Sequence, residues 1–266
     1  MKKTNLIKCI VVFAIAILVA LFIWKKIDNN KCVTFKDPAM QANIYEALKD
    51  SSSLSKGFSQ NHMTKGDLKK LKELTIIMWQ DYTTLEDLKY CVNLETLTLN
   101  SYIKASDFSY YKYDHDIDPE VDFNDYVKEN KLSSKKCEQF QTELCTIVPD
   151  LKKLTELCIQ GDVLCQLTSL QFVSAFPHLE ILHLINLTEI ENFAPLRECS
   201  NIKKLDINHC KIYDAKDLLN FDYLEEMYLW YTFICGNEKE TRLLEKAYPD
   251  ADINIYSNWA DVQEGA

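Results

Sequence analysis

Glycine and proline are scarce in this chain, with five and six copies among 266 residues. Flexible linkers and low-complexity segments are rich in these residues, so the composition leaves little room for either. Hydrophobic residues make up 47% of the chain and charged residues 26%, which is ordinary for a folded protein and argues against long disorder. The length suffices for one sizeable domain or two small ones.

Basic residues are in short supply beyond the N-terminus. Residues 1–26 carry five lysines and no acidic residue, so the remainder has 25 basic residues against 40 acidic ones. A body with this charge repels phosphate backbones. We therefore expect no nucleic-acid partner.

One long apolar run, from Cys9 to Trp24, stands between lysines at both ends. As a helix it is somewhat shorter than a hydrocarbon core, and snorkelling lysines can close that gap. We interpret residues 1–30 as a signal anchor that crosses a membrane through residues 9–24. The simplest export pattern then places the body outside the cell. Secretion after signal cleavage is one alternative, although no A-x-A-like site follows the run, and a body that faces the cytosol is another.

The pattern L-x-x-L-x-L recurs along the body, and its start-to-start spacings are 23, 60, 25, 23 and 22 residues. Apart from the 60, these are the lengths of leucine-rich repeats. The six copies occupy residues 71–76, 94–99, 154–159, 179–184, 202–207 and 224–229. The sequence thus predicts six strands of one parallel sheet, with their leucines inside.

Apolar residues also fall three, six, nine and twelve positions before the first strand leucine. Before Leu94 they are Cys91, Leu88, Leu85 and Tyr82, and the same spacing precedes Leu179, Ile202 and Leu224. Before Leu154 the spacing selects Leu151, Val148 and Cys145. A period of three predicts a short 3₁₀ or tight helical turn on the outer side of each coil.

Four segments carry a resemblance to a known family. "FKDPAMQANIYEALK" (35–49) and "MTKGDLKKLKELTI" (63–76) resemble the helical cap that opens bacterial internalin-type leucine-rich repeat domains. "LEDLKYCVNLETLTLN" (85–100) is similar to their repeat unit, and "LLEKAYPDADINIY" (243–256) resembles their closing helix and strand. The resemblance implies an α/β leucine-rich repeat solenoid that binds other molecules at a bacterial cell surface. No wall-sorting motif or wall-binding module is visible, so the anchor would have to hold the protein.

These features divide the chain into consecutive regions. We expect the anchor at 1–30, a helical cap at 31–70, and repeats at 71–236. A C-terminal cap and tail occupy 237–266. The long spacing between the second and third repeats indicates an insertion at about 101–137.

Side chains alternate along a strand, so the residues that flank the last two leucines face outward on the concave sheet. On this basis His183, Ile181 and Ile185 are exposed, and Tyr228 and Trp230 lie two strands away. Aromatic anchors beside apolar residues fit the hot spots of protein interfaces, although strands also favour such residues for their own sake. The predicted protein-binding residues are Thr98, Asn100, Cys158, Gln160, Ile181, His183, Ile185, Lys204, Asp206, Asn208, Glu226, Tyr228 and Trp230.

Cys158, His183 and Asp206 occupy the same middle position on three successive strands. Neighbouring strands would place them about 4.8 Å apart, in the order of a thiol nucleophile, a base and an orienting acid, and the same types can bind zinc. However, an open sheet is wet and nothing here supplies an oxyanion hole. We therefore expect a non-enzymatic protein without cofactor or metal, and keep a thiol hydrolase or zinc protein built on this column as the alternative.

The insertion is rich in aspartate and tyrosine at residues 106–130. Asp114, Asp116 and Asp118 track the first ligands of a calcium-binding loop, but Pro119 stands where that loop needs glycine, and Asp125 where it needs glutamate. We expect a solvated acidic loop, with a looser calcium site as the alternative. Its interleaved aromatic residues predict packing on the solenoid edge or a second contact surface.

Nine cysteines lie beyond the anchor, and none forms a C-x-x-C zinc pair. Cys91, Cys145 and Cys199 fall at inward positions of the period-three pattern. Cys210 follows a strand where these repeats take asparagine or cysteine, so we expect it to be structural filling. So many free thiols indicate a compartment that is not strongly oxidising.

Overall fold

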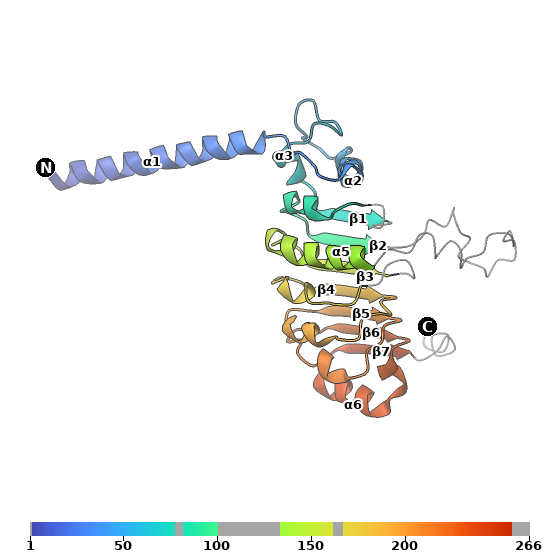
Figure 1. The fold of residues 1–266 in the computed structure, drawn as a ribbon. Coiled ribbons are helices and arrows are strands. Elements are labelled where there is room, and N and C mark those ends of the chain that lie inside the picture. Colours follow the sequence, from blue (N-terminus) through green and yellow to red (C-terminus); the bar gives the residue numbers. More distant parts are fainter. Residues whose placement is uncertain (1, 78–81, 101–133, 162–166, 257–266) are drawn as a thin grey trace, which may run out of the picture.

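The computed structural model describes residues 2–77, 82–100, 134–161 and 167–256. Within these ranges, parallel strands stack in strict chain order into one seven-stranded sheet, which contains the six strands that the repeat pattern predicts and one more, β7 (Figure 1). The strands are β1 (Glu73–Ile77), β2 (Thr96–Asn100), β3 (Glu156–Gln160), β4 (Ile181–Ile185), β5 (Lys204–Asn208), β6 (Glu226–Trp230) and β7 (Asp252–Tyr256).

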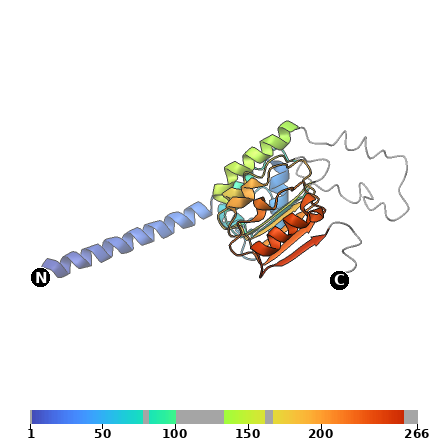
Figure 2. The same cartoon turned by 90° about the horizontal axis from the view of Figure 1, so that it is seen from below.

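The sheet is covered on one face by helices, and no described element covers the other face, which we call the open face (Figure 2). Four coils carry a 3₁₀ helix on the covered side: η2 (Glu86–Tyr90), η4 (Val173–Ala175), η5 (Ala194–Glu198) and η6 (Ala215–Leu218). The period-three residues before β2, β4, β5 and β6 are all buried, which confirms the predicted spacing for these coils. A 3₁₀ helix repeats every three residues, so one side of it faces the core throughout.

The coil before β3 departs from that pattern. Its outer side is an α-helix, α5 (Ser134–Ile147), followed by the 3₁₀ turn η3 (Val148–Asp150). The inward prediction for Cys145 is wrong, because that residue is exposed on α5. A helix with 3.6 residues per turn selects a different set for the core. The buried residues here are Cys137, Phe140, Leu144 and Ile147.

The residues immediately after the strands share a backbone conformation. Asn186, His209 and Tyr231 follow β4, β5 and β6 with φ of 55°, 51° and 52°, in the left-handed region. Cys210 comes next after His209 and is buried, as predicted. Its thiol lies 3.4 Å from the carbonyl oxygen of Leu184 and 3.3 Å from that of Asn208. The Cys210 thiol is a small weak donor, and its single hydrogen is within reach of both carbonyl oxygens.

Gly161 follows β3 at the equivalent place and is needed for a close approach. A Cβ atom there would lie 2.7 Å from the carbonyl oxygen of Asn186 and 2.8 Å from Cδ2 of Leu187. The Gly161 amide donates to the carbonyl oxygen of Ile185 at 2.7 Å, so the backbones of neighbouring coils are already in contact. A side chain has no room at this point.

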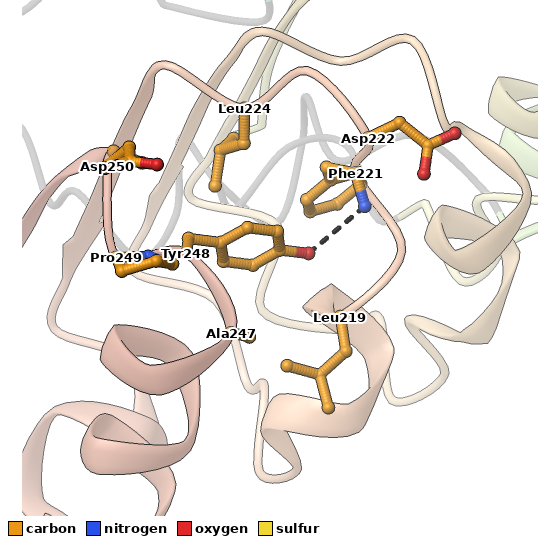
Figure 3. Close-up of a pocket in the computed structure, with 9 residues that line it drawn as sticks. Leu219, Phe221, Asp222, Leu224, Ala247, Tyr248, Pro249 and Asp250 are labelled. Atoms are coloured by element: carbon orange, nitrogen blue, oxygen red, sulfur yellow. Dashed lines mark hydrogen bonds between the residues drawn. The ribbon is translucent and has the colours of Figure 1, made fainter.

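The far end of the solenoid is closed by η7 (Phe233–Gly236), α6 (Glu238–Ala247) and the edge strand β7. Asn237 caps α6 by accepting from the backbone amides of Lys239 and Glu240. Tyr248 joins this closing unit to the preceding coil: its hydroxyl donates to the carbonyl oxygen of Leu218 at 2.7 Å and accepts from the Phe221 amide at 3.1 Å (Figure 3).

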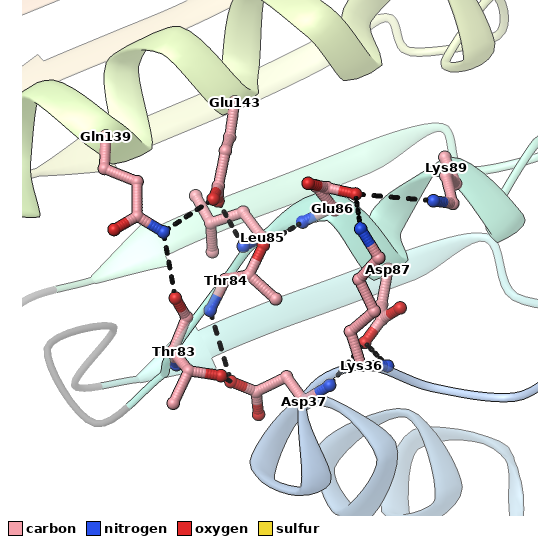
Figure 4. Close-up of polar contacts among 10 residues, drawn as sticks. All are labelled: Lys36, Asp37, Thr83, Thr84, Leu85, Glu86, Asp87, Lys89, Gln139 and Glu143. Carbon is pink, nitrogen blue, oxygen red and sulfur yellow. Dashed lines mark hydrogen bonds and ion pairs between the residues drawn. The ribbon is translucent and has the colours of Figure 1, made fainter.

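The near end is closed by α2 (Pro38–Leu48) and α3 (Lys65–Leu68), in the region predicted to be a helical cap. Two buried aspartates hold this end to the first repeat. Asp37 caps α2 through the Met40 amide at 2.8 Å and also accepts from the hydroxyl of Thr83 at 2.7 Å. Asp87 in turn accepts from the amides of Lys36 and Asp37, both at 2.8 Å (Figure 4). Burial raises the pKa of Asp87.

The same contact region continues onto α5 (Figure 4). Glu143 accepts from the Leu85 amide at 2.6 Å, and the Gln139 side-chain amide donates to the carbonyl oxygen of Thr83 at 3.0 Å. Hydrogen bonds therefore join the cap and the first repeat to the α5 coil, so they connect residues that precede 101–133 in the sequence to residues that follow it.

The N-terminal helix α1 (Lys2–Asn29) projects away from the solenoid (Figure 1). Its stretch Ile10–Asn29 is long and apolar enough to cross a membrane, and none of it is buried against the rest of the protein. A signal sequence has the same length and composition.

The described cysteines are all free thiols, and two of them, Cys32 and Cys145, are exposed. The calcium-loop prediction at 114–125 and the aromatic residues of 106–130 lie outside the described residues.

Asp67 generates a prediction about acid stability. Burial alone would raise the pKa of this carboxyl group, but hydrogen bonds from Ser55 and Thr64 outweigh it and lower the pKa to about 2. A lowered folded-state pKa stabilises the fold above the unfolded pKa, and this stabilisation is lost as the pH falls through the folded value. Asp67→Asn should therefore cost about 2 kcal/mol at neutral pH, and the difference from the parent should vanish between about pH 4 and pH 2.

Denaturant unfolding across that pH range measures the effect. Asp50→Asn is the control, since Asp50 is an exposed carboxylate in the same cap. A parent and an Asp67→Asn variant with equal pH profiles would contradict the assigned role.

Gly161 generates a second prediction. Gly161→Ala should lower the free energy of unfolding by about 1–3 kcal/mol, because the methyl group overpacks the contact with Asn186 and Leu187. Gly236→Ala is the matched control, since a Cβ atom there would meet nothing within 4 Å. Equal unfolding free energies for the two variants would show that the coils are not in close contact at Gly161.

Candidate functional site

The open face of the sheet, opposite the 3₁₀ helices, consists of three columns of side chains. The strands pair without a stagger, so each column runs straight across the sheet. All thirteen predicted binding residues lie on this face, on β2 to β6. They are half-buried rather than exposed: the side chain of His183 is 33% accessible, because the strands on both sides flank it. His183, Ile181 and Ile185 face outward as predicted, but the prediction that they are exposed was wrong, because each is only partly accessible.

The middle column brings Cys158, His183 and Asp206 side by side, as their positions predict. Nδ1 of His183 lies 3.4 Å from Oδ2 of Asp206. The other carboxylate oxygen of Asp206 is buried and has no hydrogen-bond partner among the described residues. An unpaired buried acceptor carries a desolvation cost, and this oxygen is covered by its neighbours on the sheet.

The thiol of Cys158 is poorly suited to nucleophilic attack. Burial raises its pKa to about 11, and the negative charges of Asp206 and Glu156 act in the same direction. The thiol therefore stays protonated at neutral pH, whereas a nucleophile must be a thiolate. No hydrogen bond joins Cys158 to His183 within the described chain. Across those same ranges, no group of three or more histidine, cysteine or acidic side chains could hold a metal ion.

Aromatic side chains gather where the face reaches β6 and β7. The rings of Trp230 and Tyr256 have centroids 4.7 Å apart. The Tyr256 hydroxyl donates to Oδ1 of Asn254 at 3.2 Å, which fixes its ring. Tyr228 stands beside Asn254 in the middle column.

Charged side chains border this aromatic end. The ammonium group of Lys204 lies 2.7 Å from Oε1 of Glu226, and this pairing raises the pKa of the lysine. Farther along the first column, the Thr96 hydroxyl donates to Oε2 of Glu156 at 3.3 Å. The face therefore combines apolar and aromatic rings with a polar border, as protein-binding surfaces do.

No protein-family model and no curated protein matches the sequence. Among solved structures, an internalin (inlF) of Listeria monocytogenes is 16% identical with a TM-score of 0.45, and the match covers 74% of this chain and 51% of that one. An internalin C2 from the same organism is 17% identical with a TM-score of 0.44, covering 87% and 91%. A leucine-rich repeat protein of Bacteroides eggerthii is 11% identical with a TM-score of 0.32, covering 76% and 31%. This chain thus spans about half of the inlF structure.

The parallel register and the buried repeat leucines decide the fold by themselves. The fold is a leucine-rich repeat solenoid. The solved structures to which it is similar are internalins and a further leucine-rich repeat protein.

The repeat pattern did not assign β7 to the face of this leucine-rich repeat protein. Asp252, Asn254 and Tyr256 extend the three columns, next to Glu226, Tyr228 and Trp230. The alternation of "DINIY" was the available signal, but the L-x-x-L motif is absent there. The resemblance alone indicated a closing strand.

The repeat protein also has a hollow of about 390 Å³ at its C-terminal end, lined by residues such as Leu219, Leu224, Pro249 and Asp250 around Tyr248 (Figure 3). None of the lining residues belongs to the open face. The Tyr248 hydroxyl is already paired with two backbone groups, so the hollow is part of the closing contact.

The middle column generates a prediction about reactivity. Cys158 should be alkylated far more slowly near neutral pH than the exposed Cys32 and Cys145, because little of its thiol is ionised. The rate should be unchanged in His183→Ala. Iodoacetamide labelling of the native chain, read for each cysteine by mass spectrometry, measures both. Rapid labelling of Cys158 that depends on His183 would support the thiol-enzyme alternative instead.

Proposed function

We propose that this membrane-anchored leucine-rich repeat protein binds a protein ligand through the open face of its sheet. The observation that carries the proposal is the group of rings on β6 and β7, Tyr228, Trp230 and Tyr256, held in register on a rigid sheet. Aromatic side chains with few rotatable bonds lose little entropy when a partner covers them, so they serve as anchors in protein interfaces.

The neighbouring strands complete such an anchor. Ile181 and Ile185 offer apolar surface two strands from the rings, and His183 stands between them. Asp206 lies beside His183 in the same column, with Oδ2 3.4 Å from Nδ1 of the imidazole. The partly accessible side chain of His183 supplies a polar group between the two isoleucines.

The N-terminal helix supports the location that we propose. Ile10–Asn29 has the length and composition of a membrane span, and no other described residue packs on it along its apolar part. An exposed apolar helix of this length is stable only where a bilayer or another protein covers it. We propose that it anchors the repeat domain at the outer surface of the cell.

The alternative of a thiol hydrolase or zinc protein has less support. Its nucleophile would be Cys158, whose raised pKa opposes thiolate formation. Its base, His183, contacts Asp206 without contacting the thiol. A binding role requires neither an ionised Cys158 thiol nor a contact between this thiol and His183.

A capture experiment tests the proposal. The full chain and a His183→Ala, Tyr228→Ala, Trp230→Ala variant are presented to envelope and host extracts in detergent. The variant should bind the captured partner at least about tenfold more weakly, because it lacks the central anchors.

The control is Tyr213→Ala, Phe233→Ala. This pair removes an exposed stacked aromatic contact, with centroids 4.3 Å apart, that lies outside the strands. Loss of the partner with the control, and not with the triple variant, would place the binding surface elsewhere. Equal capture by all three proteins would reject the open face as the site.

A further inference from the structure

The junction between α1 and the cap is a docked contact rather than a linker. The Lys65 ammonium group lies 3.0 Å from Oδ1 of Asp28, and that of Lys69 lies 2.6 Å from Oδ1 of Asn29. The Lys65 amide also donates to the carbonyl oxygen of Lys31 at 2.9 Å. A Cβ atom at Gly66 would lie 3.0 Å from the Asn29 carbonyl oxygen, so α3 approaches the end of α1 closely. These contacts set the direction in which α1 leaves the solenoid.

That direction is roughly parallel to the strands. In both views α1 extends from the side of the solenoid where the strands begin (Figures 1 and 2). If α1 crosses a bilayer, as proposed above, the turns that precede the strands face the surface of that bilayer. The opposite ends of the strands are then reached from the aqueous side.

The turns that face this surface carry a gradient of charge. Before β1 and β3 they carry lysines, and Lys89 lies near the end of η2. Three of these lysines are ion-paired, Lys70 with Asp67, Lys72 with Glu95 and Lys89 with Glu86. We call this set the basic edge: Lys69, Lys70, Lys72, Lys89, Lys152 and Lys153. Before β6 and β7 the turns carry Asp222, Glu225 and Asp250 instead. A basic edge beside the anchor is notable in a body with 40 acidic residues against 25 basic ones.

Part of the basic edge is available to a ligand. Lys152 and Lys153 are exposed, and neither makes an ion pair with a described residue. At the foot of α1 there is also a hollow of about 360 Å³, lined by Lys65, Lys69 and Lys89 together with Asp28 and Asp150. Asp28 is already paired with Lys65 and with Lys31, at 3.3 Å from the latter. Lys89 is paired with Glu86 at 3.5 Å, and Lys69 contacts the neutral side chain of Asn29.

We propose that the basic edge binds the anionic lipid headgroups of the bilayer that holds α1. Lysines near an anionic membrane surface are attracted within about one Debye length, about 8 Å, and each strengthens binding about fivefold. The acidic turns before β6 and β7 are repelled by the same surface. The near end of the solenoid therefore rests on the headgroups and its far end, with the aromatic rings, is held off. This inference rests on the membrane anchoring proposed above.

The test uses the full chain reconstituted into vesicles of phosphatidylcholine alone or of phosphatidylcholine with phosphatidylglycerol. A membrane-impermeant amine reagent labels accessible lysines, which are then quantified one by one. With phosphatidylglycerol at low ionic strength, labelling of Lys69, Lys89, Lys152 and Lys153 should fall at least about threefold relative to Lys216 and Lys239. High ionic strength should restore it.

Two variants separate charge from simple proximity. Lys152→Glu, Lys153→Glu should lose the protection of Lys69 and Lys89 in phosphatidylglycerol vesicles. Lys216→Glu, Lys239→Glu carries the same change of net charge at exposed sites off the basic edge and should keep that protection. In this variant the reference lysine is Lys211, which follows β5 at the opposite ends of the strands. Equal protection in both variants would overturn the inference, and so would equal protection in both vesicle types.

Flotation of the vesicles distinguishes the two proposals. A chain that floats with both vesicle types but shows no protection retains its anchor and has no lipid-binding edge. A chain that does not float lacks the anchor, and both proposals fail. Soluble glycerol phosphate should not reverse the protection; if it does, the edge binds small anions rather than a lipid surface.

Discussion

Each coil of this protein has an apolar side that only another coil can cover. The leucines of a strand, the residues of its 3₁₀ helix and the turn that follows form one layer, and a layer is stable only between two neighbours. The two end layers therefore need covers of a different kind. Two hydrogen bonds close the near end: Asp87 accepts from the backbone amide of Asp37, and Asp37 accepts from the hydroxyl of Thr83. Tyr248 and the edge strand β7 close the far end. Every other feature depends on this stack being complete.

The open face follows from the same requirement. Because alternate residues of each strand are buried in the core, the intervening residues do not pack there, and their identity can vary with the ligand. Their half-buried state has a consequence for binding, since side chains flanked on both sides have already lost part of their rotamer freedom. A partner that covers Trp230 and Tyr256 orders little that is not ordered already.

The sequence predicted the six repeat strands, their register and most of the core, because the spacing of the repeat is a local property of the sequence and does not depend on distant contacts. The proximity of His183 to Asp206 follows from that count. Cys145 was misplaced because three-residue and 3.6-residue periods select different residues, and the helix α5 replaces the shorter turn in one coil only. The raised pKa of Cys158 comes first from burial and then from the charges of Asp206 and Glu156, and the repeat pattern does not show how deeply a side chain on the open face is buried. The docking of α1 on Lys65 and Lys69 joins segments that no local pattern relates.

The single α-helix among the 3₁₀ turns also affects the shape of the solenoid. Strands keep a spacing of about 4.8 Å whatever lies behind them, but an α-helix is about 10 Å wide and a 3₁₀ helix is slimmer. Layers that are thicker at the helical face than at the sheet favour curvature of the solenoid. The α5 coil, behind β3, is therefore the layer of the described stack whose thickness favours curvature most.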